Sequence, residues 1–335
     1  MPFNRVGAIT LAGGEDNLIS AVIDQPKGFA YFGTDTTPGE VVKIRLSDFT
    51  RVGAITMASG EDYLDKAVID QPNGFAYFGA YMAPGKVIEV GLSSFTELGV
   101  ITLEEGEVGL YSAVIDQPNG FAYFGTDTTP GKVVKIWLSD FARVGAITLE
   151  EGEDNLYATV IDQPNGFAYF GTRTVPGRVI KVGLSSFTRF GAITLAGGED
   201  NLLSAVIDQP KGFAYFGTRT DPGRVIKIRL SDFTRVGAIT MASGEDYLIS
   251  AVIDQPKGFA YFGTYTPPCK VIKIRLSDFT RVGAITLAGG EDYLYSAVID
   301  QPKGFAYFGT YTAPGKVVKI RVGGKPQLLQ IMGMG

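Results

Sequence analysis

Apolar and polar residues alternate in short stretches along this chain, and turn residues separate the stretches. Residues 112–117 (SAVIDQ), 121–126 (FAYFGT), 132–139 (KVVKIWLS) and 142–149 (ARVGAITL) have the length and the β-branched or aromatic content of strands. Between the first two, Pro118-Asn119-Gly120 predicts a hairpin turn, because Pro presets φ at its start and Gly accepts the left-handed position that closes it. The pattern predicts four antiparallel strands and leaves no room for a helix.

The same four-strand pattern returns at a constant interval of 46 residues. Seven units of this length make 322 residues, almost the whole chain of 335, and no linker or shift in composition indicates a second domain. A four-stranded antiparallel unit repeated seven times is typical of a β-propeller, whereas leucine-rich repeats are shorter and ankyrin or tetratricopeptide units are helical. The period is marked by the aspartates of the phrase IDQP: Asp24, Asp70, Asp116, Asp162, Asp208, Asp254 and Asp300.

The two ends of the chain predict a closed ring. Residues 3–11 (FNRVGAITL) match the fourth strand of the other units, such as residues 49–57 (FTRVGAITM), and the seventh unit lacks that strand. We therefore predict a single all-β domain over residues 3–322, a closed seven-bladed β-propeller in which residues 3–11 complete the last blade. Residues 323–335 are predicted to be an atypical tail, because they occupy the phase of a fourth strand without its residues.

The unit AVIDQPNGFAYFGT…PGKVVKIRLSDFTRVGAITL resembles the YVTN and NHL class of propeller repeats. The shared order is a strand ending in Asp, a Pro-x-Gly turn, an aromatic strand, a V-x-x-I strand and an outer strand, and it covers residues 3–322. The resemblance implies the propeller fold and is nearly silent on activity, since such folds host binding, scaffolding and a few enzymes. The chain departs from the WD40 class because it has one tryptophan and no Trp-Asp repeat.

Composition and charge argue against nucleic acid as a partner and against insertion in a membrane. The net charge of −5 is mild and the basic residues are spread evenly, which argues against nucleic acid, whose binding usually needs a concentrated basic face. No run approaches the ~18 apolar residues of a membrane span. The N-terminal residues lack the features of a signal peptide. We expect a chain that is not inserted in a membrane, cytoplasmic, or part of an assembled particle or surface if a leader is missing.

Residue types argue against catalysis. The chain has no histidine, which removes Ser-His-Asp and Cys-His nucleophilic sites and histidine-ligated metals. The IDQP aspartates recur in every unit, so we interpret them as acceptors for turn N–H groups rather than as paired catalytic carboxylates. The one thiol, Cys269, replaces the glycine of a Pro-Gly turn, and we expect it to be exposed and inert. We predict no enzyme activity, no cofactor and no metal.

A Glu-Asp pair recurs in six of the seven turns that lead into a first strand, for example Glu15-Asp16, Glu153-Asp154 and Glu199-Asp200. Clustered carboxylates can hold calcium, but the spacing here matches no known calcium loop. A solvated turn is the preferred interpretation.

Differences between the units gather at two places. One is the turn after the second strand: Asp35, Tyr81, Asp127, Arg173, Arg219, Tyr265 and Tyr311. The other is the start of the first strand, where two positions vary: Asn17, Tyr63, Gly109, Asn155, Asn201, Tyr247 and Tyr293, and then Ile19, Asp65, Tyr111, Tyr157, Leu203, Ile249 and Tyr295. In an antiparallel blade both places lie at the same end of the strands. The variation is therefore predicted to surround one mouth of the central channel.

Loops on a rigid scaffold are where binding is usually built, and Tyr and Arg are enriched at interface hot spots. The leading hypothesis is a non-enzymatic binding scaffold that holds a protein or peptide partner on this face. Two alternatives stay open: a structural or assembly component, or a repeat-amplified or designed propeller without a dedicated ligand, and a lectin-like glycan binder. Neutral drift would also concentrate changes in loops. The candidate binding residues are Tyr81, Arg173, Arg219, Tyr247, Tyr265, Tyr293 and Tyr311.

Overall fold

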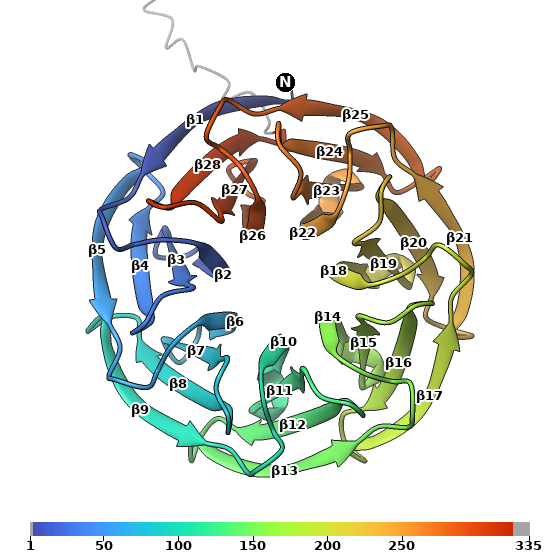
Figure 1. Cartoon of the computed structure of the whole chain (residues 1–335), viewed down its shortest axis with the longest axis horizontal. Coiled ribbons are helices and arrows are strands. Elements are labelled where there is room, and N and C mark those ends of the chain that lie inside the picture. The colour runs from blue at the N-terminus through green and yellow to red at the C-terminus, as the bar shows by residue number, and fades with distance from the viewer. Residues whose placement is uncertain (1–2, 324–335) are drawn as a thin grey trace, which may run out of the picture.

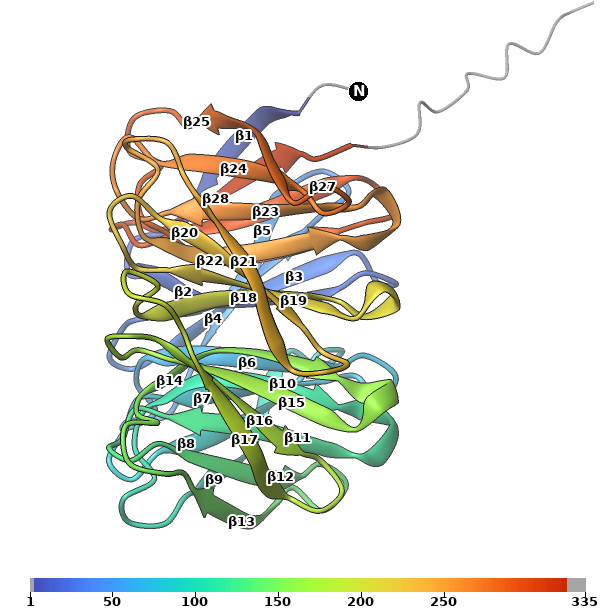
Figure 2. The same cartoon turned by 90° about the vertical axis from the view of Figure 1, so that its right-hand side faces the viewer.

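The computed structural model describes residues 3–323 and shows a ring of seven four-stranded antiparallel sheets (Figure 1). Each sheet is one blade, and in six blades the strands run in chain order from the channel to the rim; in the remaining blade the N-terminal strand is outermost. Seen from the side, the ring is a disc with connections at both faces (Figure 2). The predicted seven-bladed all-β fold is confirmed.

Blades are numbered here by the chain order of their inner strands. Blades 1 to 4 comprise β2 (Leu18–Asp24), β3 (Phe29–Thr34), β4 (Glu40–Arg45) and β5 (Thr50–Thr56); β6 (Leu64–Asp70), β7 (Phe75–Ala80), β8 (Lys86–Gly91) and β9 (Thr96–Thr102); β10 (Leu110–Asp116), β11 (Phe121–Thr126), β12 (Lys132–Trp137) and β13 (Ala142–Thr148); β14 (Leu156–Asp162), β15 (Phe167–Thr172), β16 (Arg178–Gly183) and β17 (Thr188–Thr194).

Blades 5 to 7 comprise β18 (Leu202–Asp208), β19 (Phe213–Thr218), β20 (Arg224–Arg229) and β21 (Thr234–Thr240); β22 (Leu248–Asp254), β23 (Phe259–Thr264), β24 (Lys270–Arg275) and β25 (Thr280–Thr286); and β26 (Leu294–Asp300), β27 (Phe305–Thr310) and β28 (Lys316–Arg321) with β1 (Asn4–Thr10). Four QPxG turns form single 3₁₀ turns, at Gln117–Asn119, Gln163–Asn165, Gln209–Lys211 and Gln255–Lys257. The glycine after each has φ near 70°, as the turn prediction required.

The N-terminal strand closes the ring, as predicted. β1 pairs antiparallel with β28, from Asn4 opposite Arg321 to Thr10 opposite Lys316, and so supplies the outer strand of blade 7 (Figure 1). The prediction for the tail falls mostly on residues outside those that the structure describes. Closure removes the open sheet edge that an array of blades would otherwise expose.

The core lies between blades. The adjacent Tyr and Phe of each second strand, such as Tyr31 and Phe32, are buried. Phe32 of blade 1 packs with Leu18 and with Tyr307 and Val317 of blade 7. Blades are also tied by polar bonds: Gln71 Nε2 donates to the Ile23 carbonyl of the preceding blade at 2.7 Å, and Ser20 Oγ donates to the Leu64 carbonyl of the next. This packing explains why the strand residues repeat so closely.

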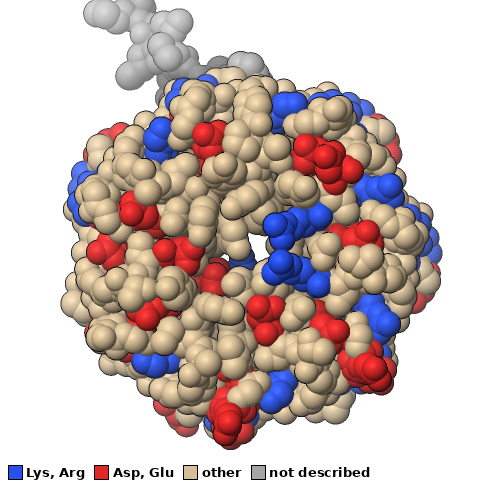
Figure 3. Space-filling view, in the orientation of Figure 1, with Lys and Arg blue, Asp and Glu red and all other residues tan. Residues whose placement is uncertain are grey.

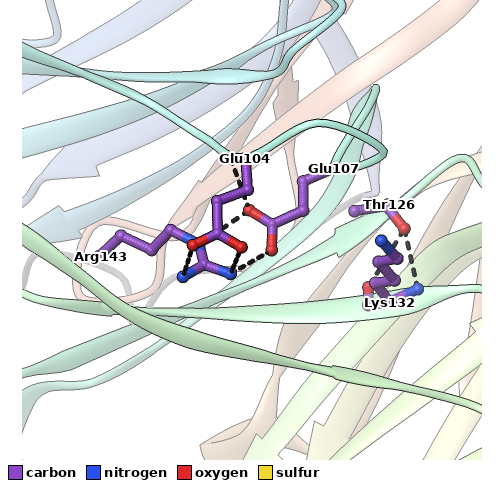
Figure 4. A network of polar contacts seen from close by, with 5 residues as sticks. All are labelled: Glu104, Glu107, Thr126, Lys132 and Arg143. Carbon is purple, nitrogen blue, oxygen red and sulfur yellow. Dashed lines mark hydrogen bonds and ion pairs between the residues drawn. The ribbon is translucent and has the colours of Figure 1, made fainter.

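The turn glutamates correct one prediction. Instead of being solvated, the seven glutamates are 1–6% exposed, and six pair with the arginine 36 residues further along the repeat, in the outer strand of the same blade. Arg143 donates to Glu107 through Nε at 2.9 Å and Nη2 at 2.5 Å, and it also binds Glu104 (Figure 4). Burial acts to raise the pKa of Glu107, but the bonds from Arg143 and from the Glu104 N–H outweigh it and the pKa is lowered.

Cys269 corrects a second prediction, that its thiol is exposed. The side chain is buried, not exposed, and its Sγ accepts the Tyr293 N–H at 2.9 Å. Burial raises the pKa of the thiol. The thiol is therefore kept protonated and away from solvent.

Candidate binding surface at the channel mouth

The two variable places meet at one end of the channel. In blade 4 the N–H of Arg173, in the turn after the second strand, donates to the carbonyl of Asn155 before the first strand at 2.8 Å; the same link joins Tyr265 to Tyr247 in blade 6 at 3.0 Å. Figure 1 looks onto this face, with the connections from outer to inner strands in front. We call it the variable face.

A cavity of about 240 Å³ lies at the channel mouth on this face. Its walls come almost wholly from positions at which the blades differ. The lining residues are Ile19, Asp35, Tyr63, Asp65, Tyr81, Tyr111, Tyr157, Arg173, Leu203, Arg219, Ile249, Tyr265, Tyr295 and Tyr311. Lys and Arg side chains border one side of the central opening, and acidic side chains lie toward the other (Figure 3).

One wall of the cavity is a row of tyrosines from blades 2 to 4. Tyr81 lies 5.4 Å from Tyr111, which stacks on Tyr157 at 4.2 Å with 15° between the ring planes. Arg173 ends the row: its Nη1 donates to the Tyr157 hydroxyl at 2.9 Å, and its guanidinium lies 5.1 Å from the centre of that ring. The stacking and the guanidinium fix the orientation of these rings before any ligand arrives.

A second aromatic wall comes from blades 6 and 7. Tyr311 lies 5.6 Å from Tyr295 and 6.4 Å from Tyr265. The Tyr311 hydroxyl donates to Asp35 Oδ2 of blade 1 at 2.5 Å, so this wall crosses the closure of the ring. Burial and the neighbouring carboxylate raise the Tyr311 pKa, which keeps the hydroxyl a donor.

Asp65 and Lys66 break the symmetry most sharply. Every other inner strand has an apolar or tyrosine residue followed by Ser or Ala at these positions, such as Ile19-Ser20. Asp65 is 4% exposed, and its Oδ2 has no hydrogen-bond partner within the described part of the chain. Burial raises the Asp65 pKa against the opposing effect of Lys66, and burial lowers the Lys66 pKa.

Lys66 projects along the channel, where its Nζ lies 5.5 Å from the centre of the Tyr295 ring. The pair therefore places one incompletely satisfied carboxylate and one ammonium inside the channel. The raised pKa of Asp65 and the lowered pKa of Lys66 both favour the neutral form of the side chain. A polar group bound in the channel would lie beside both side chains.

The structure divides the candidate residues chosen from the sequence into two groups. Five line the cavity: Tyr81, Arg173, Arg219, Tyr265 and Tyr311. The other two contact lining residues without lining the cavity themselves: the Tyr247 ring centre lies 5.8 Å from the Arg219 guanidinium, and the Tyr293 ring centre lies 4.7 Å from that of Tyr265.

Sequence reasoning left out nine lining residues that it had recognised as variable, and it missed the channel residue Lys66. The nine are Ile19, Asp35, Tyr63, Asp65, Tyr111, Tyr157, Leu203, Ile249 and Tyr295. The missed residue is Lys66, although LDKAVID is the one version of the inner strand with adjacent charged residues near its start. A comparison of the seven inner strands gives that signal directly.

The acidic turns beside the mouth contribute less charge than their sequence indicates. Glu107 and Glu153 are buried in ion pairs with Arg143 and Arg189. Among residues 3–323, no group of three or more Cys, Asp or Glu side chains is arranged to hold a metal ion.

Comparisons with known proteins show the fold and no closer relationship. No protein-family model matches the chain, and no curated protein sequence matches it significantly. Among solved structures, the chain is similar to U3-55K, with a TM-score of 0.74 at 10% identity over 93% of this chain and 98% of that one. Because 1744 solved chains match, the likeness indicates a widely used propeller architecture rather than a particular activity. No helix in the described part of the chain is long and apolar enough to cross a membrane.

Proposed function

We propose that this protein is a non-enzymatic binding scaffold that holds a protein or peptide partner on its variable face. The observation that carries the proposal is the composition of the channel-mouth cavity, where tyrosines, arginines and aspartates occupy positions that differ from blade to blade. The interior of every blade is nearly constant by comparison. Aromatic rings already held by neighbours provide contact area at little entropic cost on binding.

The charges of the cavity define the partner further. Arg173 and Arg219 stand on the side of blades 4 and 5, and Asp35 and Asp65 on the side of blades 1 and 2. A bound segment would place an acidic group against the arginines and a basic group against the aspartates, with apolar atoms on the tyrosine walls. Such an arrangement fixes the orientation of the segment.

Selection of peptides on the native protein, followed by measurement of their dissociation constants by fluorescence polarisation, tests the proposal. A variant with Arg173, Arg219, Tyr265 and Tyr311 all changed to Ser should bind the selected peptides at least tenfold more weakly. A matched control changes Arg45, Arg229 and Arg275 to Ser on the opposite face, where each pairs with an exposed aspartate. The control should bind like the native chain.

Thermal melts establish that all three proteins are folded. Equal affinity of the native chain and the quadruple variant, or failure to select any peptide, would overturn the proposal. The single change Asp65→Asn tests the acidic side of the cavity alone. It should weaken the binding of peptides that carry a basic residue and leave the affinity of the other peptides unchanged.

The YVTN/NHL-like class is proposed for the repeat on the order of its residues alone. The Asp-Gln-Pro turn, the aromatic second strand and the V-x-x-I third strand, which recur in this order, support the assignment. It adds nothing to the identity of the partner.

A further inference from the structure

The third strand of six blades carries a lysine at its centre, and each ammonium lies among three aromatic rings. Lys135 Nζ is 3.8 Å from the centre of the Phe121 ring, 5.5 Å from Tyr123 and 5.4 Å from Phe187 of the next blade. The other five are Lys43, Lys181, Lys227, Lys273 and Lys319. We call this three-ring arrangement the aromatic cage. Its repeated occupation shows that it accepts an alkylammonium group.

Blade 2 keeps the rings and lacks the lysine. Phe75 and Tyr77 of β7 and Phe141 after β12 occupy the ring positions, with Tyr77 and Phe141 5.7 Å apart, against 5.9 Å for the corresponding pair in blade 3. The central residue of β8 is Glu89. The side chain that would fill the cage is therefore replaced by one of opposite charge.

Other basic residues near the cage are also replaced in blade 2. The turn lysine of blade 1, Lys27, corresponds to Asn73, and Arg45 at the end of the third strand corresponds to Gly91. The buried aspartate beside the cage is retained as Asp70, which accepts hydrogen bonds from Asn73 at 2.7 Å and Gln117 at 3.0 Å. In the other blades burial lowers the pKa of the caged lysine and the equivalent aspartate opposes that shift, for example Asp24 for Lys43 and Asp116 for Lys135. Blade 2 therefore has the acidic field of the cage without the cation.

A cavity of about 460 Å³ lies at this position, and Phe75, Tyr77, Glu89, Phe141 and Asp70 are among its walls. Phe75, Glu89 and Phe141 are partly exposed, so the cavity is reached from solvent. Burial raises the pKa of Glu89, against the opposing effect of a hydrogen bond with Tyr77. The carboxylate is thus partly desolvated and has no cationic partner among residues 3–323, and a ligand can supply one.

We propose that the aromatic cage of blade 2 binds an alkylammonium group supplied from outside the chain. The rings contact the cation and its methylene groups, and the Glu89 carboxylate takes the place nearest its charge. The chemistry is shared by the side chain of a partner's lysine and by a small free amine. The site is formed with the QPxG and LSxF turns, on the face opposite the channel mouth, so it is independent of the function proposed for the variable face.

The test uses four probes and NMR. Saturation-transfer and chemical-shift titrations would measure binding of Nα-acetyl-lysine methylamide and of methylammonium, with Nα-acetyl-norleucine methylamide and methanol as uncharged controls. The native chain should bind an ammonium probe at least tenfold more tightly than its uncharged counterpart. Binding by the lysine probe alone points to a partner's side chain, whereas equal binding by methylammonium points to a free amine.

Two variants decide whether the cage is responsible. Glu89→Lys restores the residue of the six other blades, so it should fold and fill the cage from within, and binding should fall at least tenfold. Lys135→Glu in that background empties the cage of blade 3, where Asn119 already matches Asn73, and should create a new ammonium site. The quadruple variant of the channel mouth should bind the probes like the native chain.

The proposal is overturned if Glu89→Lys binds ammonium probes as tightly as the native chain, or if the native chain does not distinguish charged from uncharged probes. Glu89→Gln is a second test, because it removes the charge and keeps the size of the side chain. It should retain the shape of the cage and weaken the binding of ammonium probes several-fold. Melting curves of each variant show that the comparison is between folded proteins.

Discussion

Replacing Glu97 by Arg should stabilise the protein. In six blades a buried turn glutamate binds an outer-strand arginine, but in blade 2 the partner of Glu61 is Glu97. Burial raises the pKa of Glu97, and the charge of Glu61 and a hydrogen bond with it add to the increase. Glu61 is 6% exposed and still accepts the Ala58 N–H at 3.1 Å, as the other turn glutamates do at their own turns. The carboxylate is therefore already positioned for an arginine.

The magnitude follows from the equivalent contacts in blade 3. Arg143 makes two hydrogen bonds to Glu107, and bonds to charged groups contribute about 1.5–3 kcal/mol each before competing costs. The arginines of these pairs are 19–36% exposed, so solvent screening and side-chain ordering reduce the gain. We expect Glu97→Arg to raise the free energy of unfolding by about 1–2 kcal/mol, or roughly 2–6 °C in melting temperature.

The pH dependence gives the prediction its sharper test. Because the Glu97 pKa is above its ordinary value of 4.5 in the folded chain, the folded state holds more protons than the unfolded state just above pH 4.5. The native chain therefore loses stability as pH rises through the interval between 4.5 and the raised pKa. The variant lacks this loss, so its advantage should be larger at pH 7 than at pH 4.5.

Urea unfolding at the two pH values measures the effect. Leu98→Val is the matched control, since it introduces the residue found beside the arginine in most blades without changing charge, and it should shift stability by less than about 0.5 kcal/mol. The reasoning is refuted if Glu97→Arg gives no gain at pH 7 or the same gain at both pH values.

Three further predictions concern packing, reactivity and closure. Gly33→Ala should lower the free energy of unfolding by about 1–3 kcal/mol, because its Cβ would lie 2.4 Å from Ser20 Oγ and 2.9 Å from Leu64 Cβ; Gly53→Ala, with open space at its Cβ, is the control in urea titrations. The Cys269 thiol should react with a thiol reagent slowly in the folded chain at pH 7 and fast in denaturant, and equal rates would contradict its burial. Deleting residues 1–11 removes the partner of β28 and the arginine that binds Glu291, and should lower the melting temperature and cause self-association visible by size-exclusion chromatography; a stable monomer would show that β1 is dispensable.

The fold could be predicted because it depends on period and strand order. The interval of 46 residues sets the number of blades, and the match of residues 3–11 to a fourth strand predicts the closure that β1 and β28 make. These features are repeated seven times, so each copy supports the interpretation of the others. The first strand starts two residues earlier than predicted in blade 3, at Leu110, because a bulge between Leu110 and Ser112 continues the pairing.

The environment of single side chains could not be predicted in the same way. Glu15 looks like part of a solvated turn until the fold brings Arg51 against it from 36 residues away. Cys269 occupies a turn position that is buried by the following blade rather than exposed. The variable positions were recognised, but their grouping into tyrosine walls and a cavity depends on side-chain directions around the ring. The lysine cages, equally, require residues from two blades to be placed together.

Blade 2 carries four charge changes whose positions argue against drift alone. Asp65 and Lys66 lie in the channel, Glu89 lies in a cage that holds a lysine in every other blade, and Glu97 faces Glu61. Drift should collect where substitutions cost little, in exposed loops, whereas unpaired charge in a partly desolvated site is destabilising. Glu97→Arg and Glu89→Lys both return blade 2 to the common pattern, but they have different consequences. The first should affect stability only, whereas the second should also abolish ammonium binding, and that difference separates a tolerated defect from a site retained at a cost in stability.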